Sequence, residues 1–144
     1  MTQFTPLVQK RFTANAYQLK EIRQLVTEAI KNAGGSTEDL TRVVIAVNEA
    51  CMNIIQHAYK NDPSGEIIVE ILINGADFLF RVTDFAKCID PADITARDLT
   101  IVRPGGLGVP LIHAVMDQVK YKHRQNGTGN VLEMTKHIQR LATK

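Results

Sequence analysis

Cysteine is scarce in this sequence, an excess of either charge is nearly absent, and long apolar runs are missing. The two cysteines, Cys51 and Cys88, are not spaced like a zinc or redox pair, which disfavours a metal site or a disulfide. The formal net charge is +2 and the basic residues are scattered, so nothing indicates direct binding to nucleic acid or a membrane. The longest apolar run, Val43 to Val47, is too short to cross a bilayer.

The N-terminal segment, Met1 to Phe12, has no continuous apolar core of the signal-peptide kind, so we expect a cytoplasmic protein in a reducing environment. Hydrophobic residues make up 44% of the chain and are spread along its length. No stretch has the composition of a linker. We therefore expect residues 1–144 to form a single domain with one core.

Periodicity and turn residues predict the order of the elements. We expect a strand at 4–13, helices at 16–33 and 37–59, strands at 67–73 and 77–84, an irregular segment at 91–104, a helix from 108 to about 118, and strands at 119–123 and 131–138. Asn74-Gly75 and Asn126-Gly127 are turn pairs typical of hairpins. This order predicts an α+β fold, a two-layer α/β sandwich in which a mostly antiparallel mixed sheet carries helices on one face.

Polar residues recur every four positions in the second predicted helix, at Glu49, Asn53 and His57. They share one helical face, opposite an apolar stripe made of Leu40, Val44, Val47, Cys51, Ile54 and Ala58. Taken alone, such a face is usually just solvated. A carboxylate and a carboxamide one turn apart would also suit a Mg²⁺ ion and a nucleophile beside it. No metal-like cluster accompanies His57, so a packed or solvent-facing imidazole is the better interpretation.

Asp84 ends a predicted strand, and strand alternation places it on the same side as Phe78, Phe80 and Val82, which should be the buried side. A carboxylate at the edge of a core needs a partner or a ligand. Two explanations remain open. Asp84 accepts a hydrogen bond from the exocyclic amine of adenine, which guanine cannot offer at that position, or it caps the following turn.

Glycines at positions 105, 106 and 108 precede the predicted helix that contains Pro110 in its first turn. Backbone amides without side chains can approach an anion closely, and a helix N-terminus favours a phosphate. Taken alone, however, a glycine-rich turn is more often an ordinary loop.

In this order, the three features resemble the motifs of the GHKL (Bergerat-fold) ATPases and kinases. Glu49-x-x-x-Asn53-x-x-x-His57-Ala58 resembles the N box of that family, Asp84 and the residues after it the first glycine box, and Gly105-Gly106-Leu107-Gly108 the second. The resemblance covers nearly the whole chain. The chain length is most similar to that of the bacterial anti-sigma factor serine/threonine kinases of the RsbW and SpoIIAB type.

The resemblance implies ATP and Mg²⁺ as cofactors. Glu49 would then be the catalytic residue that orients or deprotonates the attacking hydroxyl, Asn53 would ligate Mg²⁺, and Asp84 would bind the adenine amine. The other implied nucleotide contacts are Ala86, Lys87, Cys88, Gly105, Gly106, Leu107, Gly108 and Thr128.

The first glycine box departs from the pattern of the family, because Ala86 and Cys88 replace the two glycines of Asp-x-Gly-x-Gly. A side chain at a position that requires a positive φ costs roughly 1 kcal/mol or more. Either the pocket has adjusted to these side chains and binds ATP, or it binds nucleotide weakly or not at all. The family also carries a Gly-Thr pair near the adenine, to which both Gly127-Thr128 and Gly129-Asn130 can be aligned.

The resemblance leads to one main hypothesis and two alternatives. The first is an ATP-binding anti-sigma regulatory factor that binds a sigma factor and phosphorylates an anti-anti-sigma (STAS) protein on serine or threonine. The second is a non-catalytic switch module of the same fold, with weak or lost nucleotide binding. The third, a histidine-kinase catalytic domain, is disfavoured by the chain length and the lack of a phosphoacceptor helix. The resemblance also suggests a homodimer through helices of the N-terminal half.

Overall fold

The computed structural model describes residues 3–86, 108–125 and 127–141. The elements follow the predicted order, and the irregular segment expected at 91–104 lies outside the described residues. In chain order they are β1 (Thr5–Thr13), the 3-10 helix η1 (Ala16–Gln18), α1 (Leu19–Asn32), α2 (Leu40–Asn53), the π-helix η2 (Ile54–Ala58), β2 (Glu66–Asn74), β3 (Asp77–Asp84), α4 (Gly108–Val115), β4 (Gln118–His123) and β5 (Asn130–His137).

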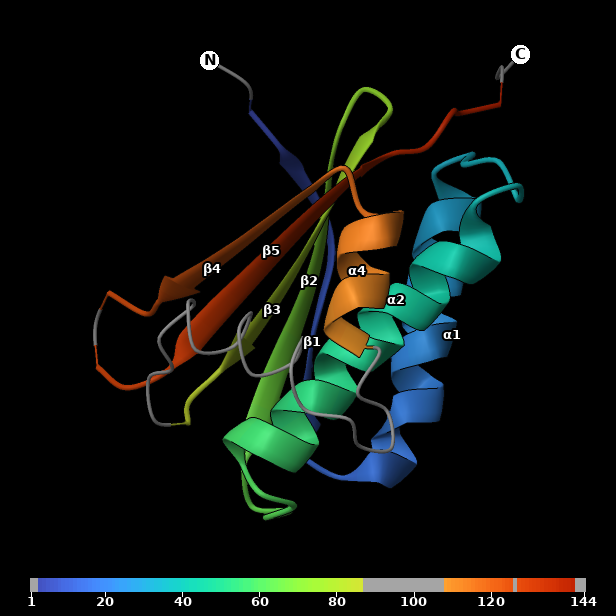
Figure 1. Ribbon diagram of the computed structural model, residues 1–144. Helices are drawn as coiled ribbons and strands as arrows, with labels where there is room; N and C mark the ends of the chain where they lie inside the picture. Colours follow the sequence, from blue (N-terminus) through green and yellow to red (C-terminus); the bar gives the residue numbers. More distant parts are fainter. Residues whose placement is uncertain (1–2, 87–107, 126, 142–144) are drawn as a thin grey trace.

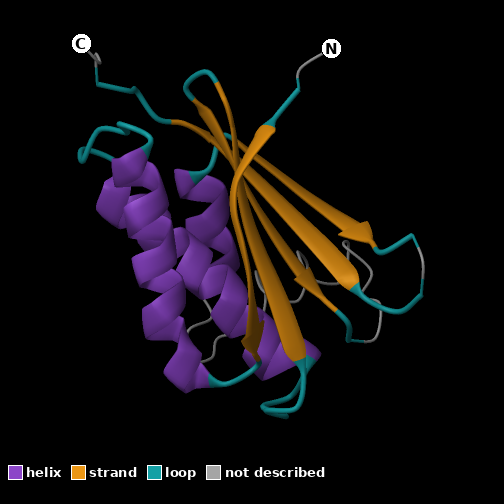
Figure 2. Cartoon of the chain, turned by 180° about the vertical axis from the view of Figure 1, so that it is seen from behind, coloured by secondary structure: helices purple, strands orange, loops and turns teal. Residues whose placement is uncertain are grey.

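The five strands form one sheet in the order β1-β2-β3-β5-β4, and each pair of neighbours is antiparallel. Figure 1 shows α1, α2 and α4 together on one side of this sheet. Figure 2, seen from behind, shows that no described helix covers the other face. The predicted two-layer α+β sandwich is therefore confirmed. Within the described ranges, no helix has the length and apolar character needed to cross a bilayer.

Alternation along the strands separates the core from the open face of the sheet. Val69 pairs with Val82, and Ile71 pairs with Phe80, and all four side chains are fully buried beneath the helices. On the open face Arg81 lies between two acidic residues: its Nη1 is 3.4 Å from Glu70 and its Nε is 2.9 Å from Glu133. The sheet therefore has one apolar layer, and its other side carries a row of ion pairs.

The apolar face of α2 differs from the predicted stripe. The residues of α2 that are fully buried are Val43, Ala46, Val47, Ala50 and Cys51. Leu40 and Val44, which the prediction placed in the stripe, are only half-buried. The buried face is rotated because α2 packs against α1 and α4 as well as facing the sheet. As a consequence, the Glu49 face of the helix is not opposite the core.

The predicted helix at 37–59 begins at Leu40 and changes into a π-helix at Ile54. The amide of Tyr59 donates to the carbonyl of Ile54 at 2.9 Å, which is the five-residue spacing of a π-turn. The helix expected to reach about residue 118 ends at Val115 instead. It stops there because Asp117 already donates its amide to Thr135 of the sheet, at 2.8 Å.

Candidate functional site

Asp84, at the end of β3, is the only charged residue that is fully buried in the described part of the chain, with 3% of its surface exposed. Its Oδ1 accepts hydrogen bonds from Asn130 Nδ2 and from the amide of Ala86, both at 3.0 Å. Burial raises the pKa of Asp84, although the hydrogen bonds from Asn130 and Ala86 act in the opposite direction. The predicted burial is confirmed, and one oxygen does cap the following turn.

Ala86 lies within the described residues. Its backbone does not have the positive φ that would make a side chain costly at this position of the glycine box. The residue is buried, with 8% of its surface exposed. In the described part of the chain, the non-glycine residues with positive φ are Lys60 and Asn61, so Ala86 has an ordinary backbone conformation. Residue 86 therefore accommodates a β-carbon without the left-handed conformation that would favour glycine.

The turn between β4 and β5 closes against the end of β3. The guanidinium of Arg124 lies 4.4 Å from the centre of the Phe85 ring, and its Nη1 donates to the carbonyl of Thr128 at 2.6 Å. Gly129 has a φ of +138°, and a β-carbon there would overlap the carbonyl oxygen of Asp84. Backbone of the β4–β5 turn thus packs directly on backbone of the Asp84 segment.

Sequence reasoning chose Thr128 in this turn and did not choose Asn130. Thr128 is exposed, whereas Asn130 begins β5 and donates to Asp84. The register of the sheet explains this contact, because Asn130 is the partner of Asp84 in the β3–β5 ladder. The available signal was the Gly129-Asn130 pair, which aligned with the Gly-Thr pattern as well as Gly127-Thr128 did.

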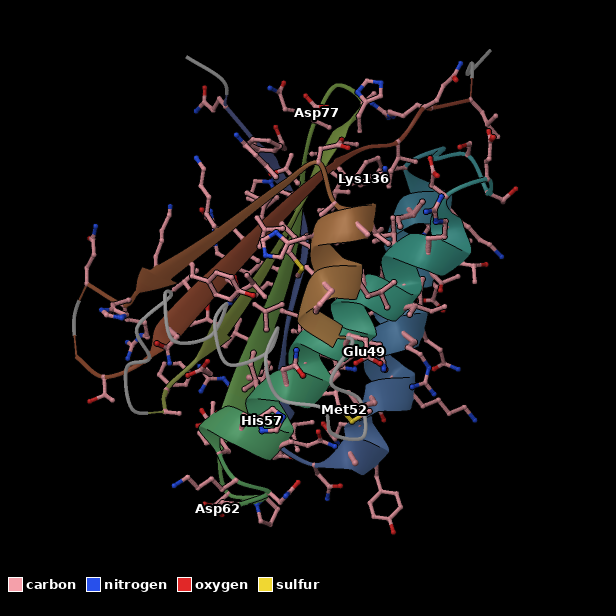
Figure 3. The ribbon with its side chains drawn as sticks, viewed as in Figure 1. Glu49, Met52, His57, Asp62, Asp77 and Lys136 are labelled. Atoms are coloured by element: carbon pink, nitrogen blue, oxygen red, sulfur yellow. The ribbon has the colours of Figure 1, made fainter. Side chains whose placement is uncertain are left out.

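Glu49 and Asn53 lie one turn apart on α2, and His57 follows on η2. Figure 3 shows Glu49, Met52 and His57 following one another down this helix. Asp77 and Lys136 lie at the end of the sheet that is farther from His57. Glu49 and Asn53 are half-buried, and His57 is exposed. A carboxylate and an amide oxygen that are partly shielded from water interact more strongly with a cation than fully solvated groups do.

The described residues include no group of three or more histidine, cysteine or acidic side chains that could enclose a metal ion. Mg²⁺ does not need such a cage in a nucleotide site, where one or two protein oxygens act together with water and phosphate oxygens. The amide oxygen of Asn53, with the Glu49 carboxylate one turn away, fits this mode of binding.

The remaining predicted contacts are only partly described. Lys87, Cys88, Gly105, Gly106 and Leu107 lie outside the described residues, and Gly108 is the first residue of α4. The structure brings Asp84, Ala86 and Asn130 together at one end of the sheet. Glu49 and Asn53 come from the helical layer.

Comparisons with known proteins identify the family of this chain. The family model of the histidine kinase-like ATPase domain matches residues 12–136. The chain is 32% identical to the serine-protein kinase RsbW of Bacillus thuringiensis (strain Al Hakam) over 144 residues, which cover 92% of this chain and 86% of that protein. The serine-protein kinase RsbW of Bacillus mycoides (strain KBAB4) is 30% identical over 142 residues, with the same coverage.

Two solved structures share the fold. One contains the RsbU and RsbW domains of a Mycobacterium tuberculosis protein; its TM-score is 0.67 at 19% identity, over 95% of this chain and 33% of that chain. The other is the SiaB–SiaC complex from Pseudomonas aeruginosa, with a TM-score of 0.62 at 14% identity, over 90% of this chain and 89% of that chain.

Proposed function

Since this chain belongs to the histidine kinase-like ATPase family, within the GHKL superfamily, we propose that it binds ATP with Mg²⁺ and acts as an anti-sigma regulatory factor and a serine/threonine protein kinase. The observation that carries the proposal is the buried carboxylate of Asp84 at the end of β3. A buried carboxylate is costly to the fold, and a ligand that donates a hydrogen bond to it offsets part of that cost.

Asp84 selects the base in this proposal. The exocyclic amine of adenine donates to the carboxylate, whereas the carbonyl of guanine would place an acceptor against an acceptor. Asn130 and Ala86 hold Oδ1 in place, so the orientation of the carboxylate is set before a nucleotide arrives. Preorganisation of this kind favours affinity, because fewer groups have to be ordered on binding.

Glu49 and Asn53 act at the phosphate end. Asn53 would hold Mg²⁺, which when bound neutralises charge on the phosphates. Glu49 orients the serine or threonine hydroxyl of the partner and accepts its proton, while the oxygen of that hydroxyl takes the γ-phosphoryl group from ATP. The backbone amides of Gly105, Gly106 and Gly108 would approach the phosphates. We assign weaker contacts to Lys87, Cys88, Leu107 and Thr128.

The proposed phosphate acceptor is an anti-anti-sigma (STAS) protein, and a sigma factor is the second partner. Support comes from the relatives named as serine-protein kinases and from the fold shared with a protein that was solved in complex with its partner. A homodimer in the cytoplasm is part of the same proposal.

A second candidate is a non-catalytic switch module of the same fold. The observation that favours it is the buried side chain of Ala86 beside Asp84, where the family pattern has glycine. If that methyl group crowds the base, nucleotide binding would be weak and the protein would act through its partners alone.

A transfer assay with labelled ATP, Mg²⁺ and an anti-anti-sigma (STAS) protein separates the two candidates. We expect phosphate to appear on the partner, and Glu49→Ala and Asn53→Ala to slow the transfer by about 10²-fold or more. Glu28→Ala is the matched control, because this exposed acidic residue lies on α1. ATP binding without transfer would favour the switch module, and an absence of ATP binding would refute the kinase proposal.

A further inference from the structure

Tyr59 joins the helical layer to the end of the sheet at which Asp84 lies. Its hydroxyl accepts a hydrogen bond from the amide of Phe85 at 2.8 Å and donates one to the carbonyl of Glu66 at 2.6 Å. One oxygen atom thus satisfies a backbone donor just after β3 and a backbone acceptor at the start of β2. Without the Tyr59 hydroxyl, the Phe85 amide and the Glu66 carbonyl would each lose this hydrogen bond.

The register shows what this hydroxyl replaces. Ile67 pairs with Asp84 in the β2–β3 ladder, so Glu66 and Phe85 would form the next pair. The Tyr59 oxygen stands between the amide and the carbonyl of that pair. The ladder therefore ends at Asp84, and after it the Tyr59 hydroxyl bridges the two strands in place of a direct hydrogen bond between them. That chain then forms the turn in which Ala86 donates to Asp84.

The backbone around Tyr59 has uncommon conformations, which place the side chain between β2 and the end of β3. It follows the π-helix η2, and the next two residues, Lys60 and Asn61, have φ values of 51° and 65°. Left-handed conformations are uncommon for residues other than glycine, and π-turns occur frequently at functional sites. Gly65 leaves room for the Tyr59 ring, because a β-carbon at residue 65 would lie 2.5 Å from Cδ1 of that ring.

We propose that Tyr59 is a positioning residue of the nucleotide site, whose hydroxyl sets the distance between β2 and the Asp84–Ala86 turn and so places the Asp84 carboxylate against the base. This inference rests on the proposed function. Without the hydroxyl, the Phe85 amide and the Glu66 carbonyl either lose their partners or approach each other directly. The second outcome draws Phe85 and Ala86 toward β2. The Ala86 amide donates to Oδ1 of Asp84, so the carboxylate turns with them and away from the base.

Tyr59→Phe is the deciding variant, because it removes one oxygen atom and keeps the ring. Binding is measured by competition against a fluorescent ATP analogue, with ATP and with purine riboside triphosphate, which lacks the exocyclic amine. We expect the affinity for ATP to fall about tenfold and that for purine riboside triphosphate to change less than about twofold. Tyr17→Phe is the control, because Tyr17 is 91% exposed, and it should leave both affinities unchanged.

A second variant and a second measurement make the test independent of this one substitution. Gly65→Ala pushes the Tyr59 ring aside and should reduce the preference for ATP in the same direction. Amide exchange should show faster exchange at Phe85 in Tyr59→Phe than in wild type, because the amide has lost its acceptor.

Equal loss of both nucleotides in Tyr59→Phe would assign Tyr59 a general structural role and overturn the inference. If Tyr59→Phe leaves the affinities for both nucleotides unchanged, the inference is also overturned, while the proposed function stays intact. Wild-type protein that binds no ATP would remove the proposed function and this inference with it.

Discussion

Gly129→Ala tests whether the β4–β5 turn and the Asp84 segment are packed as closely as the structure indicates. Gly129 has a φ of +138°, a conformation that L-residues rarely adopt, and holding alanine there costs about 1–3 kcal/mol. The added β-carbon would also lie 2.5 Å from Cδ of Arg124 and overlap the carbonyl oxygen of Asp84. The arginine can move, but the Asp84 backbone is paired with strands on both sides.

The two effects together set the expected magnitude. Overpacking against backbone adds about 1–3 kcal/mol to the conformational strain, so we expect the free energy of unfolding to fall by about 3 kcal/mol. For a chain of this length, that corresponds to a decrease in Tm of about 10 °C. ATP binding should weaken as well, since the displaced atom belongs to the residue that is proposed to bind the base.

Gly75→Ala is the matched control. Gly75 has a φ of +61°, and no atom lies within 4 Å of the position that its β-carbon would take. It should therefore show the conformational cost alone, about 1 kcal/mol or a decrease of about 3 °C in Tm. Thermal and urea unfolding of the three proteins measure the difference. If Gly129→Ala is no less stable than Gly75→Ala, the close packing and the reasoning from it are wrong.

Two further predictions concern buried ionisable groups. Burial raises the pKa of Asp84, so the wild-type free energy of unfolding should decrease as the pH rises through that raised value. Asp84→Asn should be at least as stable as wild type at neutral pH, lose that advantage below about pH 4, and bind ATP at least about tenfold more weakly. Urea unfolding across pH measures the stability, and ATP titration measures the binding. A variant that is less stable than wild type at neutral pH would contradict the prediction. Burial raises the pKa of the Cys51 thiol to about 12, so mass spectrometry after iodoacetamide treatment at about pH 8 should find Cys51 unmodified in the native protein and modified in urea.

Local patterns in the sequence were sufficient to predict the architecture. The two hairpins and the helical periods follow from short-range preferences, so the order of the elements could be predicted, and the alternation along β3 placed Asp84 in the core. The position of the buried face on α2 could not be read in this way. Which side of a helix is covered depends on every element that packs against it, and here α1 and α4 both do.

The residue types of the candidate site were set by the sequence itself: Glu49 and Asn53 one helical turn apart, and an acidic residue at the end of a core strand. The tertiary structure alone decided which groups surround that acid. Asn130 is 46 residues from Asp84 in the sequence, and Tyr59 is 26 residues from Phe85. Contacts of that separation arise from strand register and from the exit angle of a helix, and periods of two and 3.6 residues carry no information about either.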